Sequence, residues 1–129
     1  MKAIRFVEPW SCRLEEVPDP QIGDEDVLVR VAATGVCASD ILALSGRHPF
    51  RTLPSFPGHE AAGTVVRVGS KVTDFAPGDR VCIEPQRTCG KCEFCQSGEY
   101  QLCPEKQMLG TPAWPGSFAE YVSAPVSTL

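Results

Sequence analysis

Four cysteines within fifteen residues constrain this chain more than any other feature. Cys89, Cys92 and Cys95 follow one another at three-residue spacing, and Cys103 comes after seven further residues. Each Cys-x-x-Cys step fits a tight turn that directs both sulfurs toward one centre, so four thiolates can surround a tetrahedral zinc ion with zinc–sulfur bonds of about 2.3 Å. Four protein ligands leave no position for water or substrate. We therefore expect a structural zinc site that performs no chemistry.

Two other interpretations of these cysteines compete with zinc. They can be buried or disulfide-bonded residues. They can also hold an iron–sulfur cluster, because a Cys-x-x-Cys-x-x-Cys run followed by Cys103-Pro104 is similar to the bacterial ferredoxin pattern. The last gap of that pattern is three residues, whereas here it is seven. The spacing therefore favours zinc over an iron–sulfur cluster.

Charge and hydropathy exclude several classes of partner and location. The net charge of −4 argues against nucleic acid, which favours a basic surface. The segment Met1–Phe6 lacks the apolar core of a signal peptide, and no apolar run approaches the roughly 20 residues that cross a bilayer. Seven cysteines without an export signal indicate a reducing compartment. We expect a cytoplasmic protein with no membrane partner.

The hydrophobic pattern predicts a mainly β fold. A chain of 129 residues can bury one core and is too short for two ordinary domains. A short helix is expected to begin at Ser39 or Asp40 and to stop at Gly46. Many short strands separated by turns indicate a compact β-barrel or sandwich. The strands are expected at residues 1–7, 13–17, 27–31, 62–68, 80–84 and 118–123.

Cys37 and His59 form a second candidate metal pair. Cys37 precedes the predicted helix, where the helix dipole favours a thiolate. A catalytic zinc takes three protein ligands and keeps a fourth position open. Asp40 or Glu60 can complete the ligand set or orient its members. The hydroxyl of Ser39, two residues beyond Cys37, can reach a zinc-bound oxygen.

Taken singly, the cysteines and histidines outside the four-cysteine lobe have simpler interpretations than metal binding. Cys37 can be a small core residue, and His59 can be a structural hydrogen-bond donor. We expect Cys12 and Cys82 to fill the core, because both lie in or beside predicted strands. His48 is expected to be a solvated loop residue.

Taken together, the motifs resemble those of the zinc-dependent medium-chain alcohol and polyol dehydrogenases. Each motif is weak by itself, but their order is highly specific and covers almost the whole chain. The segments Val81–Pro85 and Gly98–Cys103 look more like the polyol branch of this family. The motifs are Gly35–Asp40, Pro57–Glu60, Gly63, Gly78–Val81, the four cysteines already described and Gly116–Tyr121.

The resemblance implies a fold and a set of roles. It implies a GroES-like, partly open β-barrel with short helices, in which residues 1–129 form a zinc-binding catalytic domain and residues 85–104 form the zinc lobe. It also implies that Cys37, His59 and Glu60 hold or adjoin a catalytic zinc. Ser39 would then relay the substrate proton, and Asp40 would support the ligands. The structural zinc would be held by Cys89, Cys92, Cys95 and Cys103.

The resemblance further implies a cofactor and a substrate. Family members bind NAD or NADP in a Rossmann-type domain, but this sequence contains no Gly-x-Gly-x-x-Gly motif. The family's third catalytic ligand also lies downstream. We therefore expect that the Rossmann domain is absent from this chain, and that the chain alone binds zinc without turning over substrate. The expected substrate is a small alcohol or polyol, oxidised to a carbonyl by hydride transfer.

Two further points stay open at this stage. The resemblance allows a homo-oligomer, whose size the residues do not set. The competing hypothesis is a stand-alone binding or scaffold module stabilised by one zinc. Such a module accounts for the four-cysteine lobe, but it gives no reason for Cys37, Ser39 and His59 to occur in the family's order.

Overall fold

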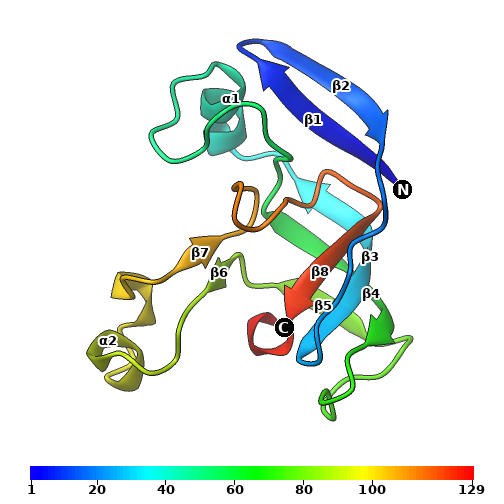
Figure 1. Ribbon diagram of the computed structural model, residues 1–129, viewed down its shortest axis with the longest axis vertical. Coiled ribbons are helices and arrows are strands. Elements are labelled where there is room, and N and C mark those ends of the chain that lie inside the picture. The colour runs from blue at the N-terminus through cyan, green and yellow to red at the C-terminus, as the bar shows by residue number, and fades with distance from the viewer.

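Antiparallel strands dominate the computed structural model, which describes all of residues 1–129 (Figure 1). The strands are β1 (Lys2–Glu8), β2 (Ser11–Glu16), β3 (Asp26–Gly35), β4 (Glu60–Val68), β5 (Arg80–Ile83), β6 (Gln86–Arg87), β7 (Gln107–Met108) and β8 (Tyr121–Pro125). The helices are α1 (Ala38–Leu44), α2 (Glu93–Gln96) and the 3-10 turns η1 (Tyr100–Leu102) and η2 (Val126–Thr128). None of these helices is long and apolar enough to cross a membrane.

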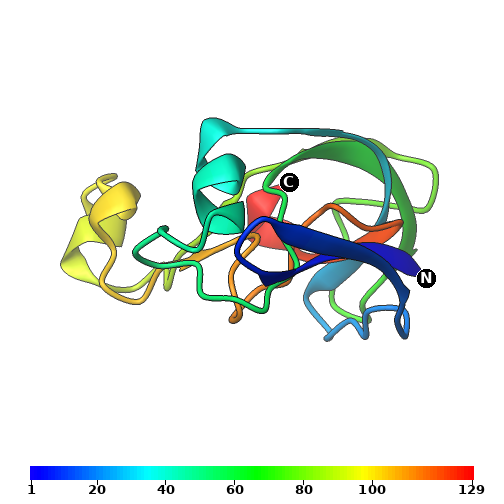
Figure 2. The same cartoon turned by 90° about the horizontal axis from the view of Figure 1, so that it is seen from above.

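The strands form three antiparallel sheets. The central sheet has the order β5-β4-β3-β8, β1 pairs with β2 in a hairpin, and β6 pairs with β7. The hairpin is joined to the segment before β8 by a bridge between Ala3 and Ala119 and by a 2.7 Å hydrogen bond from the Ile4 N–H to the Phe118 carbonyl. In both views the segment around α2 projects to one side of the sheets (Figures 1 and 2).

The core lies against the central sheet. Val27 and Val29 are two residues apart on β3 and fully buried, as expected for side chains on one face of a strand. Burying a side chain of this size contributes about 1.5–3 kcal/mol relative to leaving it exposed. Ten buried residues make up this cluster: Val27, Val29, Ala61, Val65, Val81, Ile83, Leu109, Trp114, Val122 and Ala124.

The projecting lobe has no comparable core. Neither α2 nor η1 contains a buried residue, and Leu102 and Tyr100 are exposed. Cys103 is the exception, with only 1% of its surface exposed. A segment that buries so little apolar surface needs another source of stability, such as a bound metal ion.

The mainly β class with few helices is confirmed, with differences at the element ends. The helix starts earlier than predicted: Cys37 is the N-cap residue, and Ser39 and Asp40 lie inside the first turn. Gly46 ends this segment as predicted, at a φ of 74°. The strand predicted from residue 118 begins only at Tyr121.

The expectation that Cys12 and Cys82 fill the core is wrong. Both side chains are exposed. Cys82 lies between the buried Val81 and Ile83, and alternation along β5 therefore turns it to the other face. Cys12 lies on β2, where no residue is fully buried.

Gly63 allows the close approach of β4 to β3. A Cβ at this position would overlap the carbonyl oxygen of Arg30. We expect Gly63→Ala to lower the free energy of unfolding by about 1–3 kcal/mol, because the strands would have to separate. Urea unfolding, with Thr64→Ser on the same strand as the control, measures this. Equal stability of the two variants would contradict the packing described here.

Candidate metal centres

The pairing of β3 with β4 brings Cys37 and His59 together. In the register of these strands Gly35 faces Glu60. Cys37 lies two residues beyond the end of β3, and His59 lies immediately before β4. The ligand atoms of Cys37, His59 and Glu60 consequently lie within 4.8 Å of one another.

Gly58 sets the position of His59. Its φ is +94°, and a Cβ there would overlap the backbone nitrogen of Phe118. The Gly58 carbonyl accepts a 3.0 Å hydrogen bond from the Ser117 N–H, and the Pro57 carbonyl accepts one of 3.0 Å from the Phe118 N–H. The segments 57–60 and 116–121, which are separate motifs in the sequence, therefore form one packed unit under the candidate site.

Asp40 is buried next to this site, and its two carboxylate oxygens approach Cys37 and His59 separately. Its Oδ2 accepts a 3.0 Å hydrogen bond from the Cys37 N–H, and its Oδ1 lies 3.4 Å from His59 Nδ1. The side chain is only 1% exposed, and Arg51 Nη1 donates a 2.9 Å hydrogen bond to Oδ1. The guanidinium of Arg51 offsets the cost of burying this carboxylate. Asp40 thus fixes the backbone of one candidate ligand and faces the ring of the other.

The ring of His59 is prepared to bind a further group. Nδ1 is buried and makes no hydrogen bond in the chain, although Asp40 Oδ1 is near. Nε2 lies 4.0 Å from Glu60 Oε1, and the Glu60 side chain is 54% exposed. A metal ion on Nε2 would leave Nδ1 protonated and directed at a carboxylate, which is the usual arrangement around metal-bound histidines. A thiol, an imidazole and a carboxylate fit a zinc ion that keeps one position open.

A cavity of about 720 Å³ opens beside this cluster. Ser39 and His59 both line it, so a small molecule bound there can reach the Ser39 hydroxyl and the candidate metal position. His48 also lines the cavity and is half-buried, which corrects the expectation of a solvated loop residue. The other lining residues are Phe50, Arg51, Lys106, Gln107, Met108, Thr111, Pro112 and Ala113.

The four cysteines of the lobe form a separate cluster. Their sulfurs lie 3.5 Å apart for Cys92 and Cys95, 3.6 Å for Cys89 and Cys103, and 4.0 Å for Cys89 and Cys95. A tetrahedral zinc site with 2.3 Å bonds has sulfur–sulfur distances of about 3.8 Å. The cysteines are all free, which contradicts the disulfide interpretation. The fit to the coordination sphere of one ion favours zinc over a multi-iron cluster.

Backbone N–H groups and neighbouring thiols shift the pKa values of two of these cysteines in opposite directions. Hydrogen bonds from the backbone N–H groups of Lys91 and Cys92 lower the pKa of Cys89 to about 7. The backbone N–H of Cys95 acts to lower the pKa of Cys92 too, but burial and the neighbouring thiols outweigh it and raise this pKa to about 11. Four thiolates together therefore require a cation among them.

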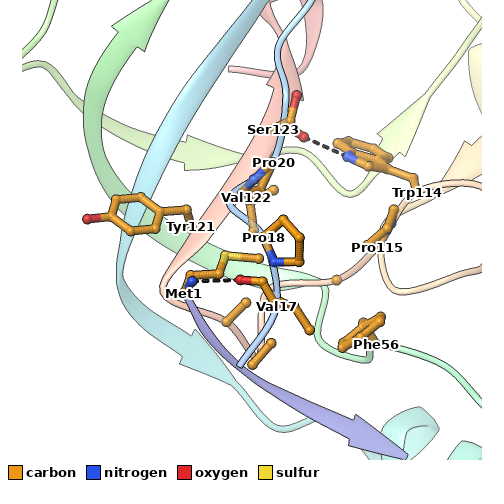
Figure 3. A pocket seen from close by; sticks show the side chains of 13 residues that line it. Met1, Val17, Pro18, Pro20, Phe56, Trp114, Pro115, Tyr121, Val122 and Ser123 are labelled. Atoms are coloured by element: carbon orange, nitrogen blue, oxygen red, sulfur yellow. Dashed lines mark hydrogen bonds between the residues drawn. The ribbon is translucent and has the colours of Figure 1, made fainter. Parts of the chain in front are cut away.

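A second cavity, of about 360 Å³, is apolar (Figure 3), and no residue of either cluster lines it. Met1, Val17 and Pro18 approach it from one side and Trp114 and Pro115 from the other. Trp114 Nε1 already donates a 2.8 Å hydrogen bond to the Ser123 carbonyl. No Cys, His, Asp or Glu lines this cavity, so it offers no metal ligand.

Comparison with known proteins finds one matching family. The family model of the alcohol dehydrogenase GroES-like domain matches residues 23–129. Sorbitol dehydrogenase of Bacillus subtilis (strain 168) is 42% identical over 125 residues, which are 95% of this chain and 35% of that protein.

Two solved structures extend this comparison. Galactitol-1-phosphate dehydrogenase of Escherichia coli superposes with a TM-score of 0.93 at 31% identity, covering 99% of this chain and 37% of that one. A protein of Sinorhizobium meliloti 1021 described as a zinc-binding dehydrogenase, bound to NADP, gives a TM-score of 0.88 at 39% identity, covering 98% of this chain and 36% of that one. The chain thus spans little more than a third of the length of these relatives.

The buried Arg51–Asp40 pair leads to a stability prediction. Asp40→Asn leaves the Arg51 guanidinium buried without a counter-charge, so we expect a loss of about 3–5 kcal/mol in the free energy of unfolding. Denaturation of the metal-free chain measures it. Glu15→Gln, which breaks the more exposed 3.4 Å pair with Arg5, is the control and should cost less than about 1 kcal/mol. An equal loss of unfolding free energy in Asp40→Asn and Glu15→Gln would contradict the larger contribution of the buried pair.

Proposed function

Because this chain belongs to the alcohol dehydrogenase GroES-like domain family, we propose that residues 1–129 are the catalytic half of a zinc-dependent alcohol or polyol dehydrogenase. The reaction would convert an alcohol to a carbonyl and deliver a hydride to NAD or NADP. The named activities of the relatives support this class, among them sorbitol dehydrogenase.

One observation carries the proposal most strongly. Cys37, His59 and Glu60 present three different zinc-ligand types within 4.8 Å of one another, and His59 faces a cavity that also contains Ser39. A scaffold module needs the lobe cysteines but has no use for an open ligand set beside a cavity. The arrangement therefore favours catalysis over a purely structural role.

Each residue would have a distinct task. Cys37, His59 and Glu60 would hold or adjoin the metal ion, and zinc, when bound, supplies Lewis-acid polarisation of the substrate oxygen. Ser39 would accept the proton of the substrate hydroxyl and release its own hydroxyl proton to water in the cavity. Asp40 would keep His59 and the backbone of Cys37 in place.

The hydride acceptor would be bound outside residues 1–129. The sequence contains no Gly-x-Gly-x-x-Gly motif. The NADP-bound relative from Sinorhizobium meliloti 1021 is consistent with a nicotinamide cofactor for the complete protein. The choice between NAD and NADP would be made by residues of that other part.

The lobe would serve stability. We assign a structural zinc to Cys89, Cys92, Cys95 and Cys103, because their sulfurs match a tetrahedral site and the surrounding segment buries little apolar surface. With the Cys37–His59 site this gives one structural and one catalytic ion for the chain.

Activity requires the complete polypeptide that contains this chain. We expect it to reduce NAD or NADP with a polyol, as measured by the absorbance of the reduced nicotinamide. We expect Cys37→Ser to lower kcat/KM by at least about 100-fold through loss of the metal. Cys82→Ser, at an exposed cysteine outside both clusters, is the control. Unchanged activity of Cys37→Ser would refute the assignment.

The lobe is tested by metal content and thermal stability. We expect Cys92→Ser to bind one zinc ion fewer than the unaltered chain and to lose several degrees or more in Tm, because metal binding supplies folding free energy there. Cys12→Ser is the matched control, since Cys12 is free and exposed. Full zinc content in Cys92→Ser would contradict a four-sulfur site.

A further inference from the structure

We propose that His48 is a specificity-determining residue, which donates a hydrogen bond from Nε2 to a substrate oxygen other than the reacting one. The inference rests on the proposed function and narrows its substrate class. It predicts that the cavity selects alcohols with a second oxygen function, such as polyols, over alcohols with a single hydroxyl group.

The hydrogen bonds of His48 fix its tautomer. Nδ1 accepts two backbone N–H groups, from Phe50 at 3.1 Å and from Arg51 at 3.1 Å. A ring nitrogen that accepts hydrogen bonds carries no proton, so in the neutral ring the proton is on Nε2. Nε2 has no hydrogen-bond partner within the chain and is therefore a free donor.

The ring is also held in place. The two hydrogen bonds to Nδ1 orient it, and the largely exposed Phe50 packs edge-on against it, with ring centroids 6.2 Å apart. His48, Ser39 and His59 line the same cavity of about 720 Å³. A ring already oriented by two backbone hydrogen bonds loses little conformational freedom when a ligand binds, so a hydrogen bond from its Nε2 contributes to selectivity.

The charges around the cavity favour the same substrates. Partial burial and the positive charge of Arg51 hold the pKa of His48 below its usual value, against a smaller opposite effect of Asp40. This lowered pKa favours the neutral ring, in which Nε2 carries the proton. Lys106 also lines the cavity, although its Nζ already donates a 2.6 Å hydrogen bond to the Gln101 carbonyl, and no carboxylate is among the lining residues. Side chains such as Ser39, His48 and Gln107 line the cavity with hydrogen-bonding groups, which suits a ligand that brings several oxygen atoms.

This arrangement disfavours alcohols that carry a single hydroxyl group. An alcohol with one hydroxyl group uses its oxygen at the metal position and leaves the His48 donor unpaired when water is excluded. Sites built to hydrogen-bond a polar group reject analogues without it far more strongly than an apolar pocket does. We expect His48 to account for a preference of about 10- to 100-fold, corresponding to one hydrogen bond.

The tautomer can be tested directly in this chain. Long-range nitrogen–proton correlation spectra of the zinc-loaded protein distinguish protonated from unprotonated ring nitrogens. We expect His48 to show an unprotonated Nδ1 and a protonated Nε2. A proton on Nδ1, or rapid exchange between the two tautomers, would overturn the inference without any measurement of activity.

The selectivity can be tested in the complete polypeptide. His48→Phe keeps a planar ring and removes the donor, whereas His48→Asn keeps both a donor and an acceptor for the backbone. The measured quantity is kcat/KM for sorbitol divided by kcat/KM for 1-butanol. We expect this ratio to fall about 10- to 100-fold in His48→Phe and to fall much less in His48→Asn.

Thr52→Ala provides the control on the same loop, at an exposed residue outside the cavity. Zinc content and Tm identify any variant that has lost its fold. An unchanged ratio in a folded His48→Phe enzyme would overturn the role of His48 and leave the proposed function intact. A complete protein that oxidises no alcohol would instead overturn the proposed function, and this inference with it.

Discussion

The register of β3 against β4 is the constraint on which the candidate active site depends. Because Gly35 faces Glu60, the chain leaves β3 and enters β4 at the same end of the sheet, and Cys37 and His59 meet there. A slip of one residue would turn every side chain of a strand to the opposite face. The valines that fill the core therefore also fix the distance between the two candidate ligands.

Asp40 connects this sheet geometry to chemistry. A buried carboxylate is costly, and it persists here because Arg51 and the Cys37 N–H both bind it. The same carboxylate faces the unpaired Nδ1 of His59. One residue thus stabilises the first turn of α1, fixes a candidate ligand and orients another. The four-cysteine lobe does not depend on Asp40. Its four sulfurs are already spaced for one ion, and their side-chain hydrogen bonds are to one another and not to residues that line the cavity beside His59.

Most residues of the two candidate metal sites could be predicted from the sequence. The predictions that failed concern positions whose surroundings are set by tertiary contacts. Spacing identified the lobe cysteines, and ordered motifs identified Cys37, His59, Ser39 and Asp40. Arg51 was not singled out, and His48 was expected to be a solvated loop residue. Both lie in a loop whose end is held by contacts distant in sequence, such as the bridge between Phe6 and Ser55. The burial of Cys12 and Cys82 was predicted wrongly, since strand propensity does not specify which face is covered. Positions that depend on tertiary contacts carry no local signal.

The account depends on two separate zinc sites in one chain, a closed sulfur cage and an open centre beside a cavity. X-ray diffraction at the zinc absorption edge from zinc-loaded crystals of the complete polypeptide that contains this chain tests this most directly. The account predicts two anomalous peaks, one among the sulfurs of Cys89, Cys92, Cys95 and Cys103 and one beside Cys37 and His59. A peak in the lobe alone, with no zinc between Cys37 and His59, would contradict it.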